Sequence, residues 1–152
     1  MRTKLRTKIA AAVVAIATGG ALALFATSGP AVAFFSGGLF LDVHVESPAS
    51  LVARGAAVDV PLEVTCNASP NTTSVSVTVT QHAGSGVAQG TGSTSVGCTG
   101  SGQQIRVRVQ ATNAGKTFKQ GTAVASAEIF GCTPNFSVCG SETDSQTIAI
   151  QR

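Results

Sequence analysis

Apolar and polar side chains alternate along most of the chain after residue 38. The longest alternating run is Ala57–Asn67, in which valine, leucine and cysteine occupy even positions and mostly polar residues occupy odd positions. Successive side chains of a β-strand point to opposite faces of a sheet, so this run predicts a strand with one buried face. Ser74–Gln81 alternates in the same way after a turn that contains Pro70. We therefore expect the two runs to pair as antiparallel neighbours.

Shorter alternating or β-branched segments predict the remaining strands, and no stretch has a useful helical period. The expected strands are Leu39–Glu46, Val87–Ala88, Ser93–Cys98, Gln104–Ala111, Thr122–Phe130 and Ser145–Gln151. Seven or eight short strands separated by turn residues are typical of an antiparallel immunoglobulin-like β-sandwich. This all-β sandwich is the fold that the pattern predicts.

The first 33 residues follow a different pattern. Four basic residues lie within positions 1–8, an apolar run covers Ile9–Phe25, and small residues occupy Ala31 and Ala33. These three features predict a secretory signal peptide that is cleaved after Ala33. The alternative is an uncleaved membrane anchor, because an apolar run of 17 residues lies at the short end of the spanning range. The small residues before the expected cut favour cleavage, which divides the chain into a signal peptide, 1–33, and a domain, 34–152.

Removal of the signal peptide changes the charge of the protein. The whole chain has a formal charge of +3, but residues 34–152 contain six basic and seven acidic side chains, a net charge of −1. The basic excess therefore belongs to the targeting segment, and we expect no nucleic-acid partner. We expect a secreted monomer that contacts a membrane only through the signal peptide, before cleavage.

The four cysteines of an exported chain are most simply read as two disulfides. Three pairings are possible, and we favour Cys66–Cys98 with Cys132–Cys139. The second pair encloses six residues, which suits a stapled hairpin, and the first would join two distant strands. Loop entropy predicts about 3.5 and about 2.5 kcal/mol of stabilisation, respectively. Zinc sites favour cysteines two to four residues apart, so we expect no metal.

Catalytic and cofactor-binding patterns are poorly represented. Asp42 and His44 would share one face of a strand, and a serine elsewhere could complete a hydrolytic triad. No Gly-x-Ser-x-Gly motif exists, so a solvent-facing polar pair is the favoured interpretation. Gly90-x-Gly92 lacks the third glycine of a dinucleotide-binding loop. We expect no enzyme and no cofactor.

Two exposed features remain as candidates for binding. Arg106 and Arg108 form a polar stripe, and Lys116, Phe118 and Lys119 follow soon after. We interpret the stripe as the solvated face of one strand. The residues between Cys132 and Cys139 are the better candidate. A stapled loop of six residues has little interior, so an apolar tip on it is a plausible contact point. The expected contact residues are Pro134, Asn135 and Phe136.

The stapled loop from Cys132 to Cys139, followed by a terminal strand at Thr147–Gln151, resembles the neocarzinostatin-type chromophore carriers. That resemblance implies a small secreted immunoglobulin-like sandwich with two disulfides and a ligand cleft, although the other disulfide of that family is shorter in range than Cys66–Cys98. The function we expect is non-catalytic: binding, or a part of the cell exterior. The alternatives are a carrier of a small apolar ligand and a secreted inhibitor of an extracellular hydrolase.

Overall fold

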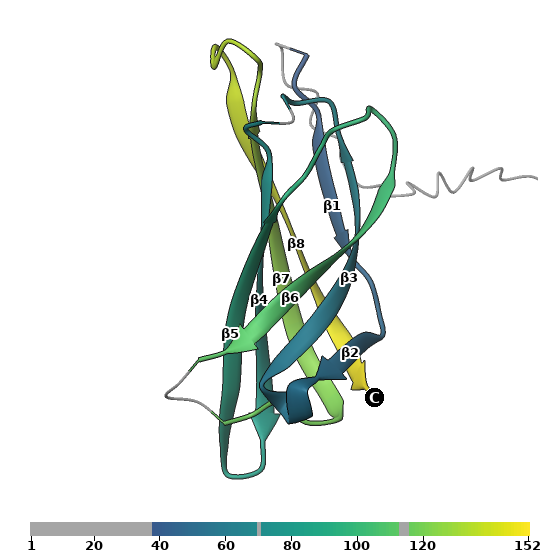
Figure 1. Ribbon diagram of the computed structural model, residues 1–152, viewed down its shortest axis with the longest axis vertical. Helices are drawn as coiled ribbons and strands as arrows, with labels where there is room; N and C mark the ends of the chain where they lie inside the picture. The colour runs from purple at the N-terminus through teal and green to yellow at the C-terminus, as the bar shows by residue number, and fades with distance from the viewer. Residues whose placement is uncertain (1–37, 70, 113–115) are drawn as a thin grey trace, which may run out of the picture. The chain divides into compact units, whose positions relative to one another are not determined.

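The computed structural model describes residues 38–69, 71–112 and 116–152 and is built from β-strands (Figure 1). One 3-10 turn, η1 (Ala53–Gly55), interrupts them. The strands are β1 (Leu41–Val45), β2 (Ala49–Val52), β3 (Ala57–Cys66), β4 (Ser74–Ala83), β5 (Gly86–Ser95), β6 (Gln103–Ala111), β7 (Gly121–Cys132) and β8 (Cys139–Gln151).

Seven of these strands close into a β-barrel, so the predicted antiparallel β-sandwich is wrong. Hydrogen-bonded neighbours follow the order β3–β2–β8–β7–β4–β5–β6, and β6 pairs again with β3. The pairing is mixed, because β2 runs parallel to β8 while the other pairs are antiparallel. β1 is the eighth strand and pairs with β3 beyond β2. A sandwich would leave the two sheets unpaired at their edges.

Glycines in β5 explain how the barrel closes. β5 meets β6 in a short ladder in which Gly90 pairs with Ala111. A Cβ atom on Gly90 would lie 2.2 Å from the carbonyl oxygen of Gln110, and one on Gly92 would lie 2.1 Å from that of Arg108. Real side chains do not tolerate such distances. The absence of side chains at these positions allows β6 to cross β5 closely enough to seal the ring.

The predicted pairing of the two longest alternating runs is also wrong. β3 pairs with β1, β2 and β6, whereas β4 pairs with β5 and β7. The connection between β3 and β4 therefore passes from one side of the barrel to the other. The two short strands expected near Val87–Ala88 and Ser93–Cys98 are instead one strand, β5, which forms a hairpin with β4. β2 was not predicted, because its four residues carry no alternation.

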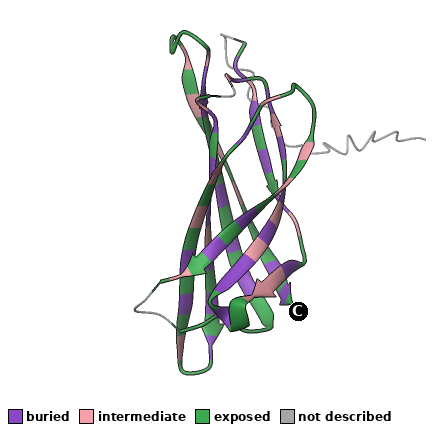
Figure 2. Cartoon of the chain, viewed as in Figure 1, coloured by how far each residue is buried: buried purple, intermediate pink, exposed green. Residues whose placement is uncertain are grey.

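Buried and exposed positions alternate along the strands (Figure 2), and the apolar side chains at the buried positions form the core. β3 and β4 supply a row of fully buried valines, together with Leu62. Phe118, between β6 and β7, is 1% exposed and is the largest of the fully buried side chains.

The signal peptide predicted for residues 1–33 lies outside the described residues. Within the part of the chain that is described, no helix has the length and apolar character needed to cross a membrane.

Candidate contact loop at the Cys132–Cys139 hairpin

The candidate loop forms the tip of the longest hairpin in the barrel. β7 and β8 pair without interruption from Gly121 and Ile150 to Cys132 and Cys139. The last pair is joined by a disulfide whose Cα atoms lie 4.0 Å apart. The other disulfide joins Cys66 to Cys98, so the cysteines pair as their spacing favoured. Cys98 lies in the connection after β5, however, and not in a strand.

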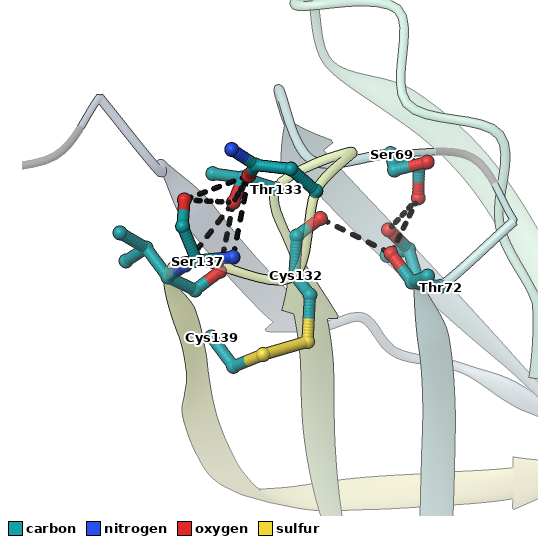
Figure 3. The surroundings of a disulfide bond; sticks show 9 residues. Ser69, Thr72, Cys132, Thr133, Ser137 and Cys139 are labelled. Carbon is teal, nitrogen blue, oxygen red and sulfur yellow. Dashed lines mark hydrogen bonds between the residues drawn. A yellow bond between two sulfur atoms is a disulfide. The ribbon is translucent and has the colours of Figure 1, made fainter.

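The Thr133 hydroxyl organises the interior of the loop (Figure 3). Thr133 Oγ1 lies 3.0 Å from Asn135 Oδ1 and 3.1 Å from Ser137 Oγ, and it accepts a hydrogen bond from the backbone N–H of Val138 at 3.1 Å. Ser137 donates its hydroxyl to Asn135 Oδ1 at 2.7 Å and its backbone N–H to the same oxygen at 3.2 Å. Side-chain hydrogen bonds of this local kind stabilise tight turns.

Phe136 projects from this network into solvent. Its side chain is 67% exposed, the largest fraction among the exposed apolar residues that the structure describes. Its backbone N–H donates to the Thr133 carbonyl oxygen at 2.8 Å, and its φ of 56° lies in the left-handed region. A non-glycine residue adopts that conformation only where its surroundings impose it. The loop therefore presents one phenylalanine in a fixed position, between the neighbouring Asn135 and the hydrogen-bonded Ser137.

The base of the loop is attached to the β3–β4 connection. The carbonyl oxygen of Cys132 accepts hydrogen bonds from the Ser69 N–H at 2.9 Å and from the Thr72 hydroxyl at 3.1 Å (Figure 3). The Thr73 hydroxyl donates to the Ser69 carbonyl oxygen at 2.8 Å, and Cys98 Sγ lies 3.4 Å from the same hydroxyl. The Cys66–Cys98 disulfide thus supports the segment on which the second disulfide rests.

Asp42 and His44 do not form the start of a catalytic triad. His44 Nδ1 lies 3.2 Å from the carboxylate of Asp144 on β8, not from Asp42. Asp144 also accepts the backbone N–H of Val45 at 2.8 Å, which joins β1 to β8. Among the described residues, no serine hydroxyl forms a hydrogen bond with His44. The His44–Asp144 pair joins β1 to β8 at the surface of the barrel.

One arginine of the stripe on β6, Arg108, is paired with an acid on the neighbouring strand β3. Arg108 holds the Asp59 carboxylate with two hydrogen bonds, at 2.8 and 2.9 Å. The hydrogen bond from Arg108 lowers the pKa of Asp59, and the adjacent carboxylate raises the pKa of Arg108. Gln104 donates to Glu46 at 3.0 Å.

All four cysteine thiols are consumed in disulfides and are not available as metal ligands. Within residues 38–69, 71–112 and 116–152, no group of three His, Cys, Asp or Glu side chains is placed to hold a metal ion. A hollow at the opposite end of the barrel is lined by both apolar and charged side chains, among them Leu51, Phe118, Arg54 and Lys119.

No protein-family model matches the chain, and no curated protein matches it. Among solved structures, the chain matches AggA, the major subunit of aggregative adherence fimbriae type I of Escherichia coli, with a TM-score of 0.32. The two sequences are 12% identical, and the match covers 74% of this chain and 93% of that one.

Proposed function

We propose that this chain is an exported, non-catalytic β-barrel domain that contacts a protein partner through the Cys132–Cys139 loop. The observation that carries the proposal is the exposure of Phe136 on a loop fixed by a disulfide and by the Thr133 network. Aromatic side chains are frequent anchors of protein interfaces. A loop that is ordered before binding loses little conformational entropy when it binds.

Two disulfides in a small domain support the exported location, because such bonds persist in oxidising compartments. Mass spectrometry of protein recovered from culture medium tests this half of the proposal. We expect a chain that begins at Phe34, contains 119 of the 152 residues (152 − 33), and lacks four thiol hydrogens. Full-length protein with four free thiols in the cytosol would contradict it.

The contact function is tested with labelled mature protein and washed cells that produce the chain. Phe136→Ser removes the exposed ring, and we expect retention on the cell surface to fall by about tenfold or more. Val87→Ser is the matched control, because Val87 is 51% exposed and lies near the β4–β5 hairpin at the other end of the barrel. Equal binding by the two variants would contradict a role for the loop.

Inhibition of an extracellular hydrolase is a second candidate, favoured by the rigid, protruding shape of the loop. Phe136 is suited to the apolar specificity pocket of a serine protease. Chymotrypsin is the first probe: stoichiometric inhibition by the wild type but not by Phe136→Ser would support this activity. Rapid cleavage without inhibition would exclude chymotrypsin-like proteases as targets.

A further inference from the structure

A basic hollow lies at the end of the barrel opposite the contact loop. It has a volume of about 1030 Å³, and its lining residues come from β2, η1, the segment before β7 and the chain after β8. Figure 1 shows these elements at the end of the barrel away from the tip of the β7–β8 hairpin. Three of the lining residues are cationic: Arg54, Lys119 and Arg152. The others are the apolar Leu51 and Phe118, the hydroxyl-bearing Thr117 and the amide-bearing Gln120. We call this feature the basic hollow.

Arg54 and Lys119 of the basic hollow are not paired with acidic side chains. Among the described residues, neither of them takes part in an ion pair. Leu51 pairs with Val58 on β3, and the acid next to Val58 is Asp59. Both carboxylate oxygens of Asp59 are already held by Arg108. A local positive field therefore persists on a domain whose net charge is −1.

The backbone around the basic hollow is fixed by a close contact between η1 and the segment before β7. The Phe118 N–H donates to the Gly55 carbonyl oxygen at 2.9 Å. A Cβ on Gly55, which has a φ of 93°, would lie 2.2 Å from the Phe118 carbonyl oxygen. Arg54 directly precedes Gly55 in the chain, and Lys119 directly follows Phe118. Arg54 itself has a φ of 56°, a conformation that a non-glycine residue adopts at a free-energy cost.

The buried side chain of Gln81 forms hydrogen bonds with the backbone of Lys119. Its side chain is 3% exposed, and its amide forms hydrogen bonds of 2.8 Å with both the N–H and the carbonyl oxygen of Lys119. The amide also lies 3.5 Å from the Thr122 carbonyl oxygen. The main chain that carries Lys119 is thus ordered without any ligand, which favours binding by a preorganised site.

We propose that the basic hollow binds a polyvalent oxyanion that carries phosphate or sulfate groups. Guanidinium groups match the geometry of these oxyanions with paired hydrogen bonds, and an ammonium group adds a point charge. Three cations around one hollow call for a ligand with at least two negative charges. The volume is in the range of sites for small organic ligands and exceeds the needs of one ion. This site is independent of the contact loop.

Isothermal titration calorimetry of the mature domain at low ionic strength tests the proposal. Sodium tripolyphosphate represents a free oligophosphate, and dextran sulfate represents charged groups carried on a polysaccharide. We expect saturable binding of at least one probe, and added salt should weaken that binding. The probe that binds more tightly identifies the source of the phosphate or sulfate groups. Absence of binding by both probes at millimolar concentration would overturn the proposal.

Three variants locate the site. Arg54→Gly removes the guanidinium and suits the positive φ, so it leaves the fold intact; Lys119→Gln removes the ammonium charge. Each should weaken binding by roughly tenfold. Arg106→Gln, on the exposed face of β6, is the control and should bind like the wild type. An equal loss in the control would overturn the assignment, as would unchanged binding by both Arg54→Gly and Lys119→Gln.

Discussion

Arg108 and Asp59 are direct register partners on β6 and β3, and they are joined by two hydrogen bonds of 2.8 and 2.9 Å. The arginine contributes Nε and Nη2, one to each carboxylate oxygen, which is the bidentate geometry that makes such pairs specific. The pair lies across the β3–β6 junction that closes the barrel. Its strength should therefore depend on the charge of Asp59.

The pKa of Asp59 is lowered in the folded protein, chiefly by the hydrogen bond from Arg108. A depressed carboxyl pKa contributes stability that is present above the pKa of the unfolded chain and is lost as the pH falls through the folded pKa. Asp59→Asn should therefore unfold at lower urea concentration than the wild type at pH 6. The difference should shrink below about pH 4. Urea midpoints between pH 2 and pH 6 measure it, and a difference that grows towards acid pH would contradict this account.

The two disulfides should stabilise the domain unequally. Replacing Cys66 and Cys98 by alanine frees a loop with a separation of 32 residues, and replacing Cys132 and Cys139 frees one of 7. Loop entropy predicts losses of about 3.5 and about 2.5 kcal/mol, and the buried Cys66 adds the cost of a cavity. Urea denaturation of both double variants measures the losses. A larger loss for the short loop would show that local strain or contacts outweigh chain entropy.

The variant that lacks Cys66 and Cys98 also tests whether this disulfide orders the base of the contact loop. Loss of the Cys66–Cys98 disulfide should also loosen the segment containing Ser69 and Thr72, which hydrogen bonds to the Cys132 carbonyl oxygen. Amide exchange at Ser69 should accelerate in that variant before global unfolding. Unchanged exchange at Ser69 would show that the two disulfides act independently.

Strand positions could be predicted from the sequence because alternation with a period of two is a local property. β3, β4, β6 and β7 follow runs that are visible in the sequence, and the spacing of the cysteines favoured the pairing that the structure contains. Partnership between strands is not local. The runs that form β3 and β4 are neighbours in the chain, yet β3 pairs with β1, β2 and β6, and β4 pairs with β5 and β7.

The basic hollow had no signal in the sequence for a related reason. Arg54 and Lys119 are 65 positions apart, and they become neighbours only through the contact of Gly55 with Phe118. The stapled loop was predictable because its two cysteines lie within eight consecutive residues, whereas its role as a contact site stays a prediction.

Thr133 should control the order of the contact loop more than the stability of the domain. Thr133→Val keeps the shape of the side chain but removes the hydroxyl that accepts the Val138 N–H. We expect amide exchange at Val138 to accelerate by about fivefold, since a net hydrogen bond contributes about 1 kcal/mol. Thr91→Val, on the exposed face of β5, is the control. If Val138 exchanged equally fast in both variants, the hydroxyl would not be what orders the loop.

Closure of the barrel rests on the absence of side chains at Gly90 and Gly92, and alanine substitution tests it directly. The added methyl of Gly92→Ala would lie 2.1 Å from the Arg108 carbonyl oxygen, so β5 and β6 must separate. We expect a loss of about 2–4 kcal/mol in the free energy of unfolding, because backbone cannot yield as a flexible side chain does. Gly97→Ala is the matched control, since nothing lies within 4 Å of its added Cβ. That variant should be neutral or stabilised by up to about 1 kcal/mol through the unfolded chain. Similar stability of the two variants in urea would mean that β5 and β6 are not held in contact, and the ring of seven strands would be open at this junction.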